Sequence, residues 1–205
     1  MSTSEGLYIL GFGGHARSVA DVAVSIGCRH IAFVDKNVCE GESFGAFPTM
    51  KALPEPSHEA WQLFPASGDN QRRAAQIQAA SLPVATLISP RASIGIESRI
   101  EAGTLVCHGA HIGPGSTLGA GVIVNTHAVI EHEVQVGDFT HISVNATIAG
   151  RSKIGSYVMV GAGAVVIDSV CVCSNVVIGA GAVVVSDIGE PGVYVGVPAR
   201  KIKTL

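Results

Sequence analysis

Four ionisable side chains stand close together in the stretch VIEHEVQVGDFTHIS, which spans residues 129–143. His132 lies between two carboxylates, Glu131 and Glu133, and His141 follows nine positions later. An imidazole, with an ordinary pKa of about 6.5, can accept a proton near neutral pH. A neighbouring carboxylate increases its basicity and fixes its tautomer. These residue types make His132 a candidate general base.

The plainer interpretation of these residues is that they are solvated side chains at a turn. Five of the eight histidines of the chain fall in one window of 34 residues, however, and this gathering favours a functional site. They are His108, His111, His127, His132 and His141.

The stretch lies within a region of the chain that repeats every six residues. Steps of six from Ile88 to Val184 meet an aliphatic residue at 17 successive positions, with a small residue four positions after most of them. A period of six fits neither a helix nor a simple hairpin. It fits a solenoid of short strands and tight corners, in which one aliphatic side chain per strand points inward. The corner that holds His132 should leave its ring accessible.

The first 84 residues lack this repeat. LYILGFGGHARSVADVAVSIG, residues 7–27, predicts a strand, a glycine-rich turn and a helix, and HIAFVD, residues 30–35, predicts a second strand. WQLFPASGDNQRRAAQIQAA, residues 61–80, predicts a further strand and helix. Such a turn presents backbone N–H groups to an anion, usually a diphosphate, and an acid after the second strand commonly holds a ribose hydroxyl.

The sequence therefore predicts an α/β plus β protein with two domains. Residues 1–84 would form a small Rossmann-like domain, and residues 85–205 a parallel β-helix with a short C-terminal tail. A nucleotide-binding domain this small suits a UDP-linked ligand better than NAD. The alternative is that the glycine-rich turn only joins a strand to a helix.

Composition and charge limit the classes of partner and the cellular location that we expect. The net charge of −3 gives no reason to expect nucleic acid. No run of 18 apolar residues predicts a membrane span, and MSTSEGLYIL at the N-terminus lacks the features of a signal peptide. The five cysteines form no CxxC pair, which favours reduced thiols and a cytoplasmic location.

The stretch NTHAVIEHEVQVGDFTHISVNATIAG, residues 125–150, resembles the bacterial UDP-4-amino-sugar N-acetyltransferases of the bacillosamine pathway, and is similar to the related sialic acid O-acetyltransferases. The resemblance extends to GFGGH at 11–15, SGDN at 67–70 and GVPARKI at 196–202. It implies a left-handed β-helix, a homotrimer with active sites between subunits, acetyl-CoA as co-substrate and no metal.

The resemblance also implies roles for single residues. The general base falls on His132, the acid that increases its basicity on Glu133, and the N–H that stabilises the thioester oxyanion on Gly150. The acetyl-CoA contacts fall on His141, Ala162 and Ala180. The UDP-sugar contacts fall on Gly13, Gly14, His15, Asp35, Lys36 and Gly68. Lys36 stands where an acid is common in the family, and Ala162 where a larger aliphatic residue occurs.

The implied activity is transfer of an acetyl group from acetyl-CoA to the 4-amine of a UDP-4-amino-4,6-dideoxy-N-acetyl-hexosamine, in the synthesis of a bacterial glycan or glycoprotein sugar. His132 would take the amine proton as the amine attacks the thioester. A covalent cysteine intermediate is not expected, because no cysteine lies near His132 in the sequence.

Three alternatives use the same residues differently. An O-acetyltransferase would act on a hydroxyl of sialic acid or a related sugar. A zinc lyase of the hexapeptide-repeat type would use His127 and His132, but the third ligand would fall near Arg91, where the sequence has no histidine. A trimeric, non-enzymatic sensor of sugar nucleotides would not need a histidine flanked by glutamates.

Overall fold

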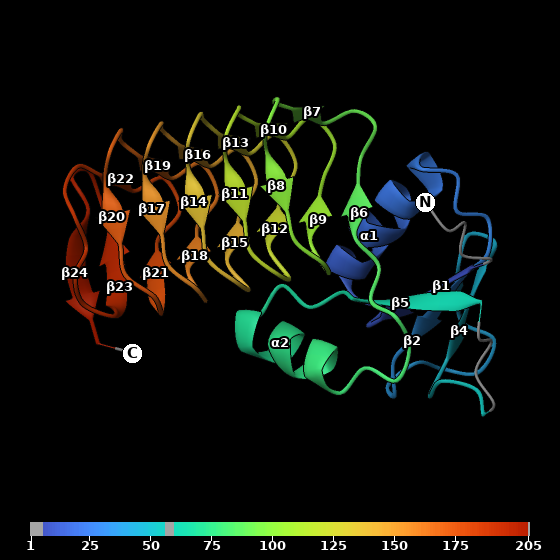
Figure 1. Ribbon diagram of the computed structural model, residues 1–205. Coiled ribbons are helices and arrows are strands. Elements are labelled where there is room, and N and C mark those ends of the chain that lie inside the picture. The colour runs from blue at the N-terminus through green and yellow to red at the C-terminus, as the bar shows by residue number, and fades with distance from the viewer. Residues whose placement is uncertain (1–5, 56–59, 205) are drawn as a thin grey trace.

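The computed structural model describes residues 6–55 and 60–204. Figure 1 shows a long ladder of short strands with a compact α/β part at one end. The α/β part contains one five-stranded sheet, in the order β3-β4-β2-β1-β5, and two helices. Its elements are β1 Gly6–Leu10, α1 Gly14–Ser25, β2 Ile31–Val34, β3 Ser43–Phe44, β4 Phe47–Met50, β5 Trp61–Pro65 and α2 Asn70–Gln78.

The α/β part confirms the predicted Rossmann-like topology. β1 pairs in parallel with β2 on one side and with β5 on the other, and β2 pairs in parallel with β4. β1, α1, β2, β5 and α2 all lie where the strand and helix patterns of the sequence predict them. The apolar stripe of α1, which includes Ala16, Val19 and Ala23, is buried.

The repeat of six builds a parallel β-helix, as predicted. From β6 to β19, each strand pairs with the strand three further along the chain, so that three sheets form three faces, and β23 and β24 extend the first of them. The first face contains β6 Leu87–Ile88, β9 Leu105–Val106, β12 Ile123–Val124, β15 His141–Ile142, β18 Met159–Val160, β21 Val176–Ile178, β23 Gly192–Val195 and β24 Arg200–Lys203. The second face contains β7 Ser93–Ile94, β10 His111–Ile112, β13 Val129–Ile130, β16 Thr147–Ile148, β19 Val165–Val166 and β22 Val183–Val184. The third face contains β8 Arg99–Ile100, β11 Thr117–Leu118, β14 Gln135–Val136, β17 Lys153–Ile154 and β20 Cys171–Val172.

The aliphatic residues of the repeat fill the interior of the β-helix. Ile112, Ile130 and Ile148 are paired in register on successive coils and are fully buried. Ile94, in the first coil, is 41% exposed because no earlier coil covers it. The register of 18 residues means that corner residues 18 apart in the sequence lie above one another.

The α/β part and the β-helix share a core. Leu105 and Ile123 point outward from the first face, yet both are fully buried in one cluster with Ile9 and Val19 of the α/β part. Val84 forms a bridge with Leu63 of the α/β sheet. The predicted division of domains after residue 84 stays a prediction.

The C-terminal residues extend the first face. β24 pairs antiparallel with β23, and Lys201 on β24 forms an ion pair with Glu190, with 2.9 Å between Nζ and Oε2. Across the two described ranges, neither helix has the length and apolar character needed to cross a membrane.

Candidate active site

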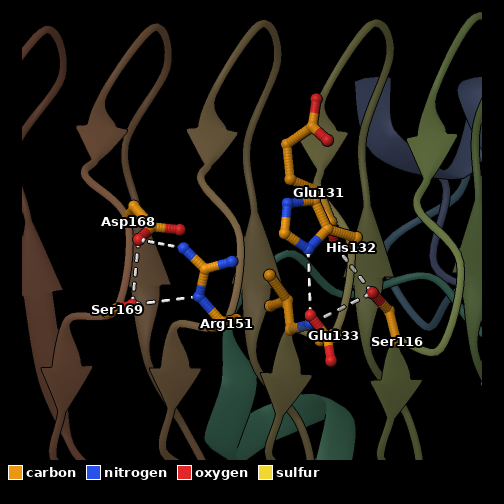
Figure 2. Close-up of polar contacts among 8 residues, drawn as sticks. Ser116, Glu131, His132, Glu133, Arg151, Asp168 and Ser169 are labelled. Atoms are coloured by element: carbon orange, nitrogen blue, oxygen red, sulfur yellow. Dashed lines mark hydrogen bonds and ion pairs between the residues drawn. The ribbon is translucent and has the colours of Figure 1, made fainter.

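His132 lies on the corner between β13 and β14, where the second face meets the third. The buried hydroxyl of Ser116, on the preceding coil, fixes both ends of this corner. Ser116 Oγ donates to the Glu131 carbonyl at 2.7 Å and accepts from the Val134 N–H at 3.2 Å. Figure 2 shows Ser116 beside the corner that carries His132 and Glu133.

Glu133 holds the His132 ring in one tautomer. The Nδ1 atom of His132 lies 3.2 Å from Oε2 of Glu133. A carboxylate only accepts hydrogen bonds, so Nδ1 carries the ring proton and Nε2 keeps a free lone pair. The side chain of His132 is 42% exposed and that of Glu133 is 64% exposed, so a substrate can reach Nε2. This geometry suits a general base, the role expected of His132 from the sequence, which stays a prediction.

Gly150 lies directly against the His132 ring, because residues 132 and 150 occupy the same corner on successive coils. A Cβ atom built on Gly150 would lie 2.6 Å from both Cε1 and Nε2 of His132. The N–H of Gly150 donates no hydrogen bond within residues 6–55 and 60–204. Nε2 of His132 thus lies next to Gly150, whose N–H is free. A general base and an oxyanion donor require such an arrangement.

Three further polar residues complete the same corner. Arg151 Nη2 donates to Asp168 Oδ2 at 2.6 Å, and Ser169 Oγ donates to the same oxygen at 2.9 Å. The hydrogen bonds from Ser169 and then Arg151 lower the pKa of the exposed Asp168 carboxyl. A Cβ on Gly150 would lie 3.1 Å from Asp168 Oδ1. Figure 2 shows Arg151 between Asp168 and the His132 ring.

The sequence analysis missed Arg151, Asp168 and Ser169. The signal that finds them is the period of one coil: steps of 18 from His132 lead to Gly150 and Asp168. The same steps from Glu133 lead to Arg151 and Ser169. Glu133, Arg151 and Ser169 each have a φ near +60°.

His141 lies elsewhere, at the junction between the first face and the α/β part. Its side chain is buried, and the residue is 7% exposed. Nδ1 lies 3.2 Å from the Gly68 carbonyl oxygen, and Nε2 lies 3.1 Å from Nδ2 of Asn125. A carbonyl only accepts, so Nδ1 of His141 carries the proton and Nε2 accepts from the Asn125 amide.

His15 faces His141 across this junction, with 6.0 Å between the ring centroids. Burial and, to a smaller extent, the charge of the nearby Arg73 together lower the pKa of His15 to about 4. Burial also lowers the pKa of His141 to about 4, against the effect of the Gly68 hydrogen bond, which raises it. Nε2 of His15 is buried and has no hydrogen-bond partner in the part of the chain that the structure describes. A buried nitrogen without a partner is unfavourable, and a ligand that reached it would supply the missing hydrogen bond.

The other residues expected to contact the sugar nucleotide lie around the start of α1 and the ends of β2 and β5. Gly13 is the N-cap of α1 and Gly14 its first residue, and a Cβ on either would meet nothing within 4 Å. Open backbone at a helix N-terminus suits a diphosphate. Asp35 follows β2 and accepts from the Asn37 N–H at 3.0 Å, and the neighbouring Lys36 is exposed.

Ala162 and Ala180 lie above one another on the corner where the first face meets the second. The Gly181 N–H donates to the Ala162 carbonyl at 2.9 Å. Ala162 is half-buried and Ala180 is exposed, so both present backbone and methyl groups at the surface.

The expected site residues thus form three groups. His132, Glu133 and Gly150 share one corner, His15, Gly68 and His141 share the junction with the α/β part, and Ala162 and Ala180 share another corner. Within one chain the second face lies between the His132 corner and the alanine corner. The roles assigned to these residues stay predictions.

The described ranges contain no group of three or more His, Cys, Asp or Glu side chains that could hold a metal ion. His127 and His132, the pair considered for zinc, lie on different corners of the same chain.

The buried histidines predict that stability falls in acid. A pKa near 4 in the folded state and about 6.5 in the unfolded state means that the unfolded chain binds more protons between these values, so stability is lost as pH falls through this window. From pH 7 to pH 5, each histidine should lower the free energy of unfolding by about 2 kcal/mol. Urea denaturation at both pH values measures this loss.

Glutamine at His15 or His141 cannot bind a proton in this range. Each variant should therefore lose less stability between pH 7 and pH 5 than the wild type, whereas a variant of the exposed His30 should match it. Equal losses in all four proteins would contradict the prediction.

Comparisons with known proteins agree with this architecture. Residues 6–80 match the family model of the PglD N-terminal domain. Among curated proteins, none matches the chain. The acetyltransferase domain of PglB from Neisseria gonorrhoeae FA1090 is 32% identical, with a TM-score of 0.89 over 97% of this chain and 100% of that domain. The same domain in complex with acetyl coenzyme A gives a TM-score of 0.88 at 32% identity, with the same coverage of both chains.

A second protein of known structure also combines an α/β part with a β-helix. A variant of GDP-perosamine N-acetyl transferase from Caulobacter crescentus, in complex with CoA and GDP-perosamine, is 29% identical, with a TM-score of 0.88 over 96% of each chain. The similarity to both proteins spans the α/β part and the β-helix alike. The chain belongs to the family of bacterial sugar N-acetyltransferases in which a PglD N-terminal domain precedes a β-helix of hexapeptide repeats.

Proposed function

We propose that this protein transfers the acetyl group of acetyl-CoA to the amine of a nucleotide-linked amino sugar. The observation that carries the proposal is the corner of His132: Glu133 holds the proton on Nδ1, and Nε2 lies against Gly150, whose N–H is free. A base and an oxyanion donor side by side are what acyl transfer to an amine requires.

The reaction needs no covalent enzyme intermediate. Nε2 of His132 accepts a proton from the sugar amine while the amine nitrogen forms a bond to the thioester carbonyl carbon. The Gly150 N–H donates to the oxyanion, which contributes a few kcal/mol. When the C–S bond breaks, the His132 imidazolium returns its proton to the departing thiolate, leaving an amide and free CoA.

The acceptor is a UDP-4-amino-4,6-dideoxy-N-acetyl-hexosamine, destined for a bacterial glycan or glycoprotein sugar. The open helix N-terminus at Gly13 and Gly14 supports a diphosphate there, and the unpartnered Nε2 of His15 supports a further hydrogen bond to the ligand. Binding through UDP follows the resemblance in sequence, whereas the Caulobacter relative was crystallised with a GDP-linked sugar. The five free cysteines favour a reducing compartment, so we place the reaction in the cytoplasm.

The test of this function is release of free thiol from acetyl-CoA in the presence of single acceptors. UDP-linked and GDP-linked 4-amino sugars, their 3-amino isomers and sialic acid form the panel. Thiol release should require a 4-amino sugar nucleotide, with the UDP-linked sugar turned over fastest. Release with sialic acid alone would replace the amine by a hydroxyl acceptor, and no release with any acceptor would overturn the proposal.

We also propose that the active protein is a homotrimer with its active sites between subunits. His132 lies on one corner of the β-helix, and the α/β part covers the first face, on the opposite side. A second copy of the chain can bring a sugar nucleotide bound at Gly13 and Gly14 to His132. Exposed apolar side chains at the corners, such as Ile96 and Ile167, favour contact between copies.

Co-expression of two inactive variants tests this arrangement. His132→Ala removes the base, and Gly14→Trp blocks the start of α1. If each site takes His132 from one chain and the α/β part from another, mixed trimers should regain activity that neither variant shows alone. A monomeric mass in analytical ultracentrifugation, or mixed assemblies without activity, would contradict the proposal.

A further inference from the structure

Arg73 on α2 is a fully buried cation without an anionic partner. Its relative exposure is 0%, and it forms no ion pair within residues 6–55 and 60–204. Burial lowers the pKa of Arg73 to about 10, although the charge of Asp69 raises it, so the guanidinium keeps its proton at neutral pH. Burying a charge among neutral groups is costly, so the arrangement calls for an explanation.

All five donor contacts of Arg73 go to neutral oxygen atoms on both sides of the junction. Nη1 donates to the Ser67 carbonyl at 2.9 Å and, more weakly, to the Gly68 carbonyl at 3.5 Å. Nε donates to the Gly121 carbonyl at 2.7 Å, and Nη2 donates to the Phe139 carbonyl at 2.7 Å. Nη2 also donates to Oδ1 of Asn70 at 2.9 Å.

These contacts fasten one loop to successive coils of the β-helix. Ser67 and Gly68 follow β5, whereas Gly121 and Phe139 lie on corners one coil apart. Nδ2 of the buried Asn70 reaches the coil after that and donates to the Val158 carbonyl at 3.1 Å. The planar guanidinium can address several carbonyls in fixed directions at once, whereas a lysine ammonium cannot reproduce this fork.

The loop that Arg73 holds carries groups expected to contact the ligand. The Gly68 carbonyl also accepts the Nδ1 proton of His141, whose ring faces His15. A shift of the Gly68 peptide would therefore change the position of His141 and the space next to His15. Arg73 itself is covered, so it acts through these groups.

We propose that Arg73 is a positioning residue that holds the Ser67–Gly68 loop in the conformation that binds the nucleotide part of the sugar substrate. The inference rests on the proposed function, because it takes Gly68, a UDP-sugar contact implied by the resemblance in sequence, as part of the nucleotide site. A loop already held in its bound conformation loses less entropy on binding, and the affinity is higher for that reason.

Isothermal titration calorimetry of Arg73→Lys and Arg73→Met with UDP, GDP and acetyl-CoA tests the proposal. Both variants should bind the nucleoside diphosphate preferred by the wild type about tenfold more weakly or worse, which corresponds to loss of about one well-formed hydrogen bond. Affinity for acetyl-CoA should fall much less, because only His141 among its expected contacts touches the Gly68 peptide. Arg72→Met is the matched control, because Arg72 precedes Arg73 on α2, carries the same charge and is exposed.

Chemical rescue separates positioning from general damage. In Arg73→Ala, guanidinium ion at low millimolar concentration should fill the vacated space and restore the affinity for the nucleoside diphosphate, with no such gain in the wild type. Wild-type affinity in Arg73→Lys would overturn the proposal, because charge alone would then suffice. An equal loss of acetyl-CoA affinity in every Arg73 variant, or absence of rescue, would also overturn it.

The wild-type titration distinguishes this inference from the proposed function. A wild type that binds neither UDP nor GDP overturns both, because the site itself is then misassigned. A wild type that binds one of them, with Arg73 variants that bind it equally well, overturns only the role of Arg73.

Discussion

Replacing His132 by alanine is expected to lower the turnover number about 10²–10⁴-fold, the usual contribution of a general base. The ring is held by Glu133 and lies against Gly150. Because the side chain is 42% exposed and fills no core, stability should change little. Steady-state kinetics with acetyl-CoA and a UDP-4-amino sugar measures the loss, and calorimetry should show that both substrates still bind.

The controls for this variant separate the base from its partner. Glu133→Gln keeps a group that can accept from Nδ1 but removes the charge, so its loss of turnover should be smaller than that of His132→Ala. His30→Ala removes an exposed histidine of the α/β part and should leave turnover unchanged. Near-normal turnover in His132→Ala would show that another group takes the amine proton.

The fold could be predicted because its two sequence signals, the repeat of six and the strand–turn–helix pattern, are strong and local. The step of six from Ile88 to Val184 fixes which side chains point inward, and it needs no knowledge of long-range contacts. Ile130 and Ile148, for example, are buried as the repeat requires. The strand, glycine-rich turn and helix of residues 7–27 are likewise short-range signals.

The site could be predicted only in part, because the repeat does not reveal what covers the outside of the β-helix. Position 141 points outward in the repeat, so the repeat alone predicts an exposed side chain there. His141 is buried because it continues an outward row with Leu105 and Ile123, on which the α/β part packs. The sequence signal for this packing was the pair of apolar residues Leu105 and Ile123, which stand at outward positions early in the first face.

The grouping of residues around His132 depends on the length of one coil. Once three steps of six make a turn, residues 132, 150 and 168 share a corner, and Asp168 joins the site. The buried Arg73 could not be foreseen at all, since its acceptors are backbone carbonyls of residues far away in the sequence, such as Gly121 and Phe139.

Alanine at Gly150 is expected to lower the turnover number about 10²-fold or more without unfolding the protein, an effect of the size seen when a reacting group is displaced by about 1 Å. The added Cβ would lie 2.6 Å from Cε1 and Nε2 of His132, much closer than carbon atoms approach without a clash. The His132 side chain is exposed enough to swing away, so the strain is relieved by moving the base rather than the coil. The backbone N–H of residue 150 remains, which isolates the effect on the base.

Gly189→Ala is the matched control, because a Cβ there would meet nothing within 4 Å and its φ requires no glycine. Thermal denaturation should give similar midpoints for the wild type and both variants, while only Gly150→Ala loses turnover. The Michaelis constants for both substrates should change much less than the turnover number, since the displaced ring acts on the transferred proton and not on the bound nucleotide. Full activity in Gly150→Ala would mean that the ring position found next to Gly150 is not the one used in acetyl transfer.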